Sequence, residues 1–375
     1  MTTDARLVVA LGGSGDGGTD RVSKAIARGL ARHRSVAFLA KSPIQSAHFL
    51  EGMDDWRERL VLSPWVRELR VRRMLVAALR LASELRRLRA THVNFHYGGI
   101  LAHAGDAVAA RFARVRRTVV SLHHPHDTRR LPRAWRLSHQ LAARWSDALV
   151  VTTPYAAGQI RHLSGNRPVE IVPIGCPSVP EAPGARARLA LPENGFVVGV
   201  LARLVPEKRV ERVVEACRTS RAFARSGFLV IAGTGPELER LSELVDRNLP
   251  GRARVIGRPH DPTDFYRSID IFMLLSEFEG FGLVFAEAAS AGVPSICSDA
   301  GGAPYVVEHG RTGWLVPEGL PEAAASFLDA WAESPTIREE MRLACTDIYR
   351  QRFTEERMVE NYDRLIFRGI PSSLS

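Results

Sequence analysis

Short apolar runs and helical stretches alternate along the whole chain. The runs are rich in Val, Ile and Leu, and such runs are typical of strands that are buried on both faces of a parallel sheet. In the first part of the chain we expect strands at residues 7–11, 36–40, 92–96, 118–122, 148–152 and 169–173. The second part repeats the pattern, with strands expected at residues 196–202, 228–232, 254–257, 269–275 and 294–298. The alternation predicts two parallel-sheet α/β domains.

A proline-rich segment, PSVPEAPG at residues 177–184, separates the two parts and has the composition of a linker. We therefore expect a first domain at residues 1–178 and a second domain at residues 179–352. The chain has 375 residues, which is long enough for two domains of ordinary size.

A glycine-rich loop, GGSGDGG at residues 12–18, follows the first expected strand and precedes a helix expected at residues 19–32. The loop contains the spacing Gly-x-Gly-x-x-Gly of dinucleotide-binding proteins, which also need an acidic residue at the end of the second strand. That strand ends in Ala40-Lys41, so the sequence disfavours a nicotinamide-dependent dehydrogenase. The glycines would still let the backbone approach a phosphate or a sugar.

Two glutamates, Glu279 and Glu287, lie on either side of a glycine turn that follows the expected strand 269–275. A helix of small apolar residues is expected after Gly282. Such a turn directs backbone N–H groups and the positive end of the helix outward, which suits a pyrophosphate. Each glutamate also has a structural reading: Glu287 can complement the helix dipole, and Glu279 can be a solvated loop acid.

Arg203 and Lys208 follow the expected strand 196–202 and should lie at the mouth of the same sheet. Two fixed cations there could neutralise the charge that grows on a leaving pyrophosphate. The alternative is a surface arginine and lysine near the start of a helix expected from Glu207.

His123 follows the expected strand 118–122, at the edge where open α/β sheets bind their ligands. It opens the sequence HHPHD, for which three readings stay open: a hydrogen bond from His123 to a substrate hydroxyl, a metal site, and a structural turn. The proline breaks the histidine spacing in a way that seldom brings ligands to one point, so a metal site is disfavoured.

The net charge of +10 is unevenly distributed. Residues 1–180 carry 28 Lys and Arg against 13 Asp and Glu, whereas residues 181–375 carry 23 against 28. The first part should therefore attract an anionic partner, which could be nucleic acid, an acidic membrane or a phosphorylated substrate. The sequence has no basic–aromatic recognition motif, so nucleic acid is disfavoured.

The stretch at residues 67–89 predicts a basic amphipathic helix, in which Arg73, Arg80 and Arg87 form a stripe. Two readings stay open: a crossover helix with a solvated face, and a surface that meets anionic lipid head groups. The apolar positions of this helix, at helical spacing, are Val71, Met74, Leu75, Ala78, Leu79, Ala82, Leu85 and Leu88.

Neither a membrane-spanning run nor the pattern of a signal peptide is found in the sequence. The four cysteines fit neither a disulfide framework nor a zinc site, and we expect them to be reduced and buried. The expected location is cytoplasmic, with peripheral contact at the inner membrane face as an open alternative.

Together these features resemble a two-domain GT-B glycosyltransferase, and specifically the large retaining group numbered family 4, the glycosyltransferase group 1 type. The resemblance covers nearly the whole chain. Its most specific parts are Arg203 with Lys208, the two glutamates in EGFGLVFAEA, and the glycines at 301–302 followed by GRTGWLV. It implies two Rossmann-like domains that face each other across a cleft, and a C-terminal helix in residues 353–375 that packs back on the first domain.

The resemblance also implies a role for each residue of the site. Arg203 and Lys208 would bind the donor diphosphate, Glu279 would bond sugar hydroxyls, and Glu287 would hold the ribose hydroxyls. His123 would contact the donor sugar near the anomeric carbon. Further donor contacts, mostly through the backbone, would come from Gly17, Gly18, Arg258, Phe281, Gly282 and Leu283. The chain departs from many relatives at Tyr305, where they carry a glutamate, so the identity of the sugar is not inferred.

The implied reaction moves a sugar from a nucleotide diphosphate sugar to a hydroxyl, with retention at the anomeric carbon. A UDP-sugar is favoured over a GDP-sugar, and the acceptor would be a glycan, a lipid-linked sugar or a small molecule. Neither a metal nor another cofactor is expected, because Arg203 and Lys208 would take the place of a metal. Two alternatives are a sugar-phosphate synthase or phosphorylase of the same fold, and a non-catalytic nucleotide-sugar-binding protein.

Overall fold

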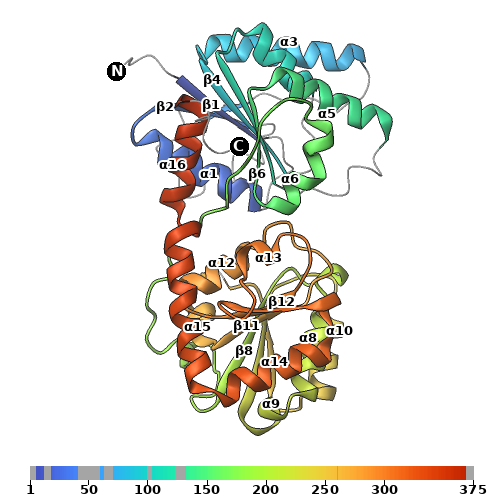
Figure 1. Cartoon of the computed structure of the whole chain (residues 1–375), viewed down its shortest axis with the longest axis vertical. Helices are drawn as coiled ribbons and strands as arrows, with labels where there is room; N and C mark the ends of the chain where they lie inside the picture. Colours follow the sequence, from blue (N-terminus) through green and yellow to red (C-terminus); the bar gives the residue numbers. More distant parts are fainter. Residues whose placement is uncertain are drawn as a thin grey trace. The chain divides into compact units, whose positions relative to one another are not determined.

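The structure is a computed structural model, and it describes residues 6–11, 18–40, 60–62, 71–98, 104–123, 132–259 and 261–368. The chain forms two compact units (Figure 1). Unit 1 comprises Met1–Gly175 together with Glu355–Ser375, and unit 2 comprises Cys176–Thr354.

Unit 1 is built on a seven-stranded parallel sheet in the order β3-β2-β1-β4-β5-β6-β7. The six strands predicted from the apolar runs are confirmed. The sheet also contains β3, whose three residues are too few to show a pattern. The strands are β1 (Arg6–Leu11), β2 (Ser35–Ala40), β3 (Leu60–Leu62), β4 (His92–Tyr97), β5 (Arg117–Leu122), β6 (Ala148–Val151) and β7 (Val169–Ile171).

Helices cover both faces of this sheet (Figure 1). Val93, Phe95 and Tyr97 of β4 point into an apolar core shared with α3, α4, α5 and α6. The opposite face is covered by α1 and α16, which pack against each other. Among the described residues of unit 1, the helices are α1 (Gly18–Ala31), α3 (Val71–Arg87), α4 (Ala104–Phe112), α5 (Arg133–Trp145), α6 (Pro154–Ile160), η3 (Arg161–Leu163), α16 (Glu355–Asp363) and η7 (Arg364–Arg368).

The last described segment, α16 with η7, is tied to the body of unit 1. Arg34 forms an ion pair with Asp363 at 3.0 Å, and Arg117 Nε donates to the Leu365 carbonyl at 2.8 Å. Gly29 of α1 lets the two helices approach closely, because a Cβ at this position would lie 2.4 Å from Val359 Cγ2. The end of the chain therefore completes the first unit.

Unit 2 is built on a six-stranded parallel sheet in the order β10-β9-β8-β11-β12-β13. The five strands predicted for this part are confirmed, and β13 is an addition. The strands are β8 (Phe196–Leu201), β9 (Gly227–Ala232), β10 (Ala253–Ile256), β11 (Ile271–Leu274), β12 (Ser295–Ser298) and β13 (Gly313–Val316). In both sheets the strand order reverses next to the first strand, β1 or β8, so each sheet has a topological switch point.

The helix expected from Glu207 begins later than predicted. Pro206–Lys208 form a 3-10 turn (η4), Arg209 adopts a left-handed conformation with φ 48°, and α8 begins at Val210. The helices of unit 2 are α7 (Ala185–Arg188), α8 (Val210–Thr219), α9 (Arg221–Ser226), α10 (Leu238–Asn248), α11 (Thr263–Ser268), α12 (Leu283–Ser290), α13 (Ala303–Val306), η5 (Pro317–Gly319), α14 (Pro321–Glu333), α15 (Pro335–Ile348) and η6 (Tyr349–Phe353).

The proline-rich segment 177–184 is bound to unit 2. The Val179 N–H donates to Ser290 Oγ at 3.1 Å, and Arg267 donates to the carbonyls of Val179 and Pro180. The division between the units falls just before this segment, between Gly175 and Cys176, and falls again between Thr354 and Glu355. All four cysteines are buried, as expected, and they are thiols rather than disulfides.

Candidate functional site

Lys208 and Glu279 meet at the topological switch point of unit 2. They follow the neighbouring strands β8 and β11, and ligands of open α/β sheets bind where such loops separate. Lys208 Nζ donates to Glu279 Oε1 at 2.9 Å, and Ser276 Oγ donates to the same oxygen at 2.8 Å. The side chains are 15% and 12% exposed, so this is a largely buried ion pair.

The backbone around Glu279 is fixed by the two glycines that the sequence motif contains. The Gly302 N–H donates to the Glu279 carbonyl at 2.7 Å. Gly301 has φ +63°, and a Cβ there would lie 2.2 Å from the same carbonyl oxygen. Only glycine combines this conformation with this close approach, so the 301–302 loop holds Glu279 in place.

Tyr305 belongs to the short helix α13 that follows this loop. The Arg352 guanidinium lies 4.4 Å from the centre of the Tyr305 ring and donates to the Tyr305 carbonyl at 3.0 Å. Arg352 also pairs with Glu308 at 3.3 Å. Tyr305 is thus held by a stacked arginine.

Helix α12 begins directly after the glycine turn. Gly282 has φ +81°, and a Cβ there would lie 2.4 Å from the Phe285 ring. The Phe281 side chain is buried and packs edge-on against Phe353, with ring centres 6.0 Å apart. This side chain therefore anchors the turn, and Phe281 has only its backbone left for a ligand.

Glu287 lies on α12 and is only 6% exposed. Its Oε2 accepts a hydrogen bond of 2.7 Å from the hydroxyl of Tyr266, which lies on α11 and is fully buried. The sequence does not predict a role for Tyr266, since nothing in the local pattern of α11 connects it to a residue 21 positions later. A carboxylate has about four acceptor sites, so Glu287 can accept hydrogen bonds in addition to the one from Tyr266.

Two other predicted residues lie on the surface of unit 2. Arg203 is 74% exposed, and its Nη2 donates to Glu207 Oε1 at 3.1 Å. Arg258 follows β10, which is the edge strand of the sheet, and is also exposed. Among the described contacts, Arg203 is not joined to the Lys208–Glu279 pair, so a direct role for it requires a ligand.

In unit 1, His123 follows β5 and is only 4% exposed. Its Nε2 lies 2.9 Å from Nδ1 of His96, and the two rings are stacked with centres 5.2 Å apart. Gly18 is the first residue of α1. Gly17, like the histidines after His123 in HHPHD, lies outside the described residues.

A buried chain of polar side chains runs from His123 to the C-terminal helix. His96 Nε2 lies 2.8 Å from Asn94 Nδ2, Ser121 Oγ donates to Asn94 Oδ1 at 3.0 Å, and the Tyr362 hydroxyl donates to Ser121 Oγ at 3.2 Å. All five side chains are at most 4% exposed. None of the expectations from the sequence includes this chain of side chains. The available signal was a period of two, because Asn94 and His96 on β4 share one face of the sheet.

Burial controls the charge state of this chain. It lowers the pKa of His96 well below its ordinary value, and the neighbouring His123 lowers it further. Burial also raises the pKa of the Tyr362 hydroxyl, which its hydrogen bond to Ser121 only partly offsets. His96 is therefore neutral and Tyr362 protonated around neutral pH.

Across the described part of the chain, no group of three or more His, Cys, Asp or Glu is placed to hold a metal ion. Within the same residues, every helix is too short or too polar to cross a bilayer.

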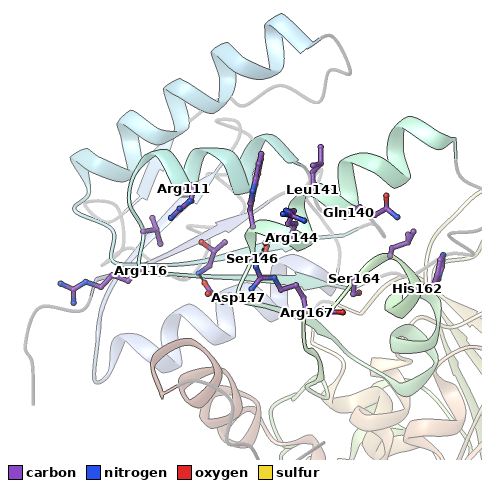
Figure 2. Close-up of a pocket in the computed structure, with 16 residues that line it drawn as sticks. Arg111, Arg116, Gln140, Leu141, Arg144, Ser146, Asp147, His162, Ser164 and Arg167 are labelled. Atoms are coloured by element: carbon purple, nitrogen blue, oxygen red, sulfur yellow. Dashed lines mark hydrogen bonds between the residues drawn. The ribbon is translucent and has the colours of Figure 1, made fainter.

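Unit 1 also contains a basic pocket (Figure 2), and its volume is about 970 Å³. The pocket lies where β5 and β6 begin, whereas His123 follows the end of β5. Arg111, Arg116, Arg144 and Arg167 line it, and Arg167 donates to the Arg144 carbonyl at 2.6 Å. The Asp147 carboxylate accepts from the Thr118 N–H at 2.7 Å. Positive charge therefore dominates this pocket.

Comparison with known proteins agrees with this architecture. A family model described as Glycosyl transferases group 1 matches residues 183–348, and one described as Glycosyltransferase Family 4 matches residues 16–177. Together the two models cover most of the chain, which therefore belongs to the glycosyltransferases that they describe. Its fold is GT-B.

Two curated relatives share moderate identity with the chain. The lipopolysaccharide core biosynthesis glycosyltransferase LpsD of Rhizobium meliloti is 30% identical over 59% of this chain and 64% of LpsD. The D-inositol 3-phosphate glycosyltransferase of Rhodococcus erythropolis is 31% identical over 56% of this chain and 51% of that protein. The chain thus spans less than two thirds of the length of these relatives.

Among solved structures, Anabaena HepE in complex with UDP has a TM-score of 0.82 with this chain at 19% identity. The match covers 96% of this chain and 98% of HepE. At this identity the likeness establishes the fold.

Proposed function

We propose that this protein is a retaining glycosyltransferase that moves a sugar from a nucleotide diphosphate sugar to an acceptor hydroxyl. The observation that carries the proposal is the Lys208–Glu279 pair at the switch point of unit 2, with the buried Glu287 on the helix that follows. A UDP-sugar is the favoured donor. HepE, which shares the fold, has been solved with UDP and with UDP-glucose, and this supports the choice.

In this proposal the protein supplies position and charge. Lys208 and Arg203 neutralise the leaving diphosphate, while Glu279 and Glu287 bind hydroxyls of the sugar and the ribose. The acceptor attacks from the face that the diphosphate leaves, and a phosphate oxygen takes the acceptor proton. The C1–O bond to the diphosphate breaks as the new C1–O bond forms, and configuration is retained. Neither a protein nucleophile nor a metal takes part.

The test is a panel of UDP- and GDP-sugars, scored by thermal shift of the protein and by slow hydrolysis of the donor. We expect one UDP-sugar to stabilise the protein and to be hydrolysed, and NMR of the freed sugar to show retention. Glu287→Ala should weaken binding of the nucleoside diphosphate. If Glu287→Ala leaves the affinity unchanged, the ribose assignment is wrong. Turnover that needs inorganic phosphate would indicate a phosphorylase, and binding without any turnover would indicate a sensor.

We further propose that unit 1 contacts an anionic membrane and thereby reaches a lipid-linked acceptor. The predicted apolar face of α3 is only partly buried: Ala82 and Leu85 enter the core, whereas Leu75 and Leu79 are 47% and 58% exposed. Neighbouring α4 and α5 expose Phe112, Leu137 and Trp145. Exposed apolar side chains beside arginines are the combination that binds acidic lipid surfaces, and the basic pocket offers a place for a head-group phosphate (Figure 2).

Co-sedimentation with vesicles of phosphatidylglycerol or of phosphatidylcholine tests this contact. We expect binding to the anionic vesicles alone, reduced by Leu79→Ser and by Arg144→Glu. Leu343→Ser is the matched control, because Leu343 is 48% exposed but belongs to unit 2. Equal binding to both kinds of vesicle, or an equal loss with Leu343→Ser, would remove the proposal.

A further inference from the structure

The hydrogen bonds of the polar chain that ends at His123 all run in one direction, from donor to acceptor. The direction is fixed by the groups that can only donate. Tyr362 keeps its proton and donates to Ser121, whose hydroxyl then donates to Asn94 Oδ1. The carbonyl end of the Asn94 amide is thereby occupied, and its NH₂ group faces His96 Nε2. An amide NH₂ can only donate, so His96 Nε2 must be the acceptor.

The direction passes through His96 to His123. A neutral imidazole carries one proton, so a ring that accepts at Nε2 carries its proton on Nδ1. His96 Nδ1 therefore donates to His123 Nε2 across 2.9 Å. Because His123 accepts at Nε2, a neutral His123 also carries its proton on Nδ1.

We infer that Tyr362, Ser121, Asn94 and His96 are positioning residues that hold His123 as its Nδ1–H tautomer. The inference builds on the proposed function, in which His123 contacts the donor sugar near the anomeric carbon. His123 Nδ1 would meet that sugar as a hydrogen-bond donor to an oxygen. It could not take a proton there, which agrees with a reaction in which the leaving phosphate acts as the base.

The residues of this polar chain come from distant parts of the sequence, and their side chains have little freedom to rotate. Asn94 and His96 come from β4, Ser121 lies opposite His96 on β5, and Tyr362 comes from α16, 241 residues after Ser121. All four are at most 2% exposed, so bulk water does not supply a second partner that would let the rings or the amide turn. A buried and fully connected chain of this kind rigidifies its members.

The tautomer can be measured on the substrate-free protein. Long-range ¹H–¹⁵N correlation spectra of ¹⁵N-histidine-labelled protein distinguish Nδ1–H from Nε2–H rings, and variants of each histidine assign the signals. We expect His96 and His123 to be neutral Nδ1–H tautomers at pH 7. Nε2–H rings at both positions would mean that the Asn94 amide is reversed and would overturn the inference.

Two substitutions test what maintains the direction. Asn94→Asp replaces the NH₂ donor by an acceptor, so His96 should carry its proton on Nε2 and His123 should donate from Nε2. Ser121→Ala removes the group that orients the amide, and both histidines should then show mixed tautomers; this milder variant serves if Asn94→Asp does not fold. Unchanged spectra in both variants would exclude the positioning role. His33→Gln, at an exposed histidine of unit 1, is the control.

Transfer kinetics test whether the tautomer of His123 matters for the reaction. We expect Asn94→Asp to lower kcat about 10²-fold, as for the loss of one preorganised donor, with little change in KM for the acceptor. If the tautomer switches while kcat is unchanged, the chain is structural and His123 does not act as a donor. If wild-type protein transfers no sugar from any donor, the proposed function fails, and the spectra still decide the tautomer.

Discussion

Lys208 and Glu279 follow two neighbouring strands of unit 2 and join in an ion pair of 2.9 Å that is largely shielded from solvent. Removing either partner leaves a buried charge without its counter-charge. A single substitution that lowers activity could therefore act through lost stability or through a lost ligand contact. Changing both residues together separates the contribution of the pair to stability from its contribution to function.

We predict that Lys208→Met and Glu279→Gln each lower the free energy of unfolding by about 1–3 kcal/mol, because each leaves a buried polar group without its partner. The double variant should regain most of this stability, since both charges are gone. Transfer should nevertheless stay about 10²-fold below wild type. Urea unfolding and transfer rates of the four proteins make the comparison. Recovery of both stability and transfer in the double variant would reduce the pair to a structural role.

Arg203 offers a cleaner test of a ligand contact. It is 74% exposed and pairs only with the nearby Glu207 among the described residues, so Arg203→Ala should change stability by less than about 0.5 kcal/mol. If it binds the donor diphosphate, the same change should lower transfer about 10²-fold. Arg218→Ala, which breaks the exposed pair of Arg218 with Glu215, is the matched control and should lower neither. Normal transfer by Arg203→Ala would remove this residue from the site.

The contact between α1 and α16 can be tested at Gly29. A Cβ at this position would lie 2.4 Å from Val359 Cγ2, and a β-branched side chain in a helix cannot easily turn away. Gly29→Ala should therefore destabilise the protein by about 1–3 kcal/mol through overpacking. Adding Val359→Ala should restore part of this loss.

Gly158→Ala is the control for Gly29→Ala, because a Cβ at Gly158 in α6 would meet no atom within 4 Å. It should be neutral or slightly stabilising. Both variants are compared with wild type by thermal unfolding. The contact has no energetic role if the two alanine variants unfold at the same temperature.

Buried histidines should make the protein sensitive to acid. Burial, and then the charge of His162, lower the pKa of His139 to about 4. The unfolded chain has the ordinary value of about 6.5, so it binds the proton first as the pH falls. The contribution of His139 is complete above about pH 6.5 and is lost between there and about pH 4. It amounts to about 3 kcal/mol.

His139→Leu should therefore lose less stability than wild type between pH 7 and pH 4, as measured by urea unfolding at each pH. The buried His96, whose pKa is also lowered, should keep a remaining slope in this variant. Parallel curves for His139→Leu and wild type would contradict the prediction.

The local pattern of apolar residues predicted the strands, because each buried strand is a run of consecutive, mostly apolar residues, from Leu7 in β1 to Ser298 in β12. It also placed Lys208 and Glu279 at the mouth of one sheet. It did not show that they pair, since their contact spans 71 residues and depends on how β8 and β11 lie side by side. The start of α8 was predicted too early because the left-handed Arg209 has no signature in composition.

The buried chain behind His123 was harder to foresee. The strand at residues 92–96 was recognised, yet its alternation of polar and apolar positions was not used. That alternation separates Asn94 and His96 from the apolar core on the other face. Tyr266 and Tyr362 reach their partners only through tertiary packing. The sequence therefore predicts the charged residues at the ends of the strands, but not the tyrosine hydroxyls that donate to buried polar groups behind them.

The docking of α16 on α1 also bears on the order in which the units fold during synthesis. All residues of unit 2 have been translated once residue 354 has been added, whereas unit 1 still lacks the segment that carries Tyr362 and Asp363. Because residues 355–375 leave the ribosome after all of unit 2, unit 1 cannot complete its fold before unit 2 has emerged, in contrast to the usual N-to-C order. Until then the polar face of β4 is covered by α1 but lacks α16, so unit 1 is the part of the nascent protein that stays incomplete longest.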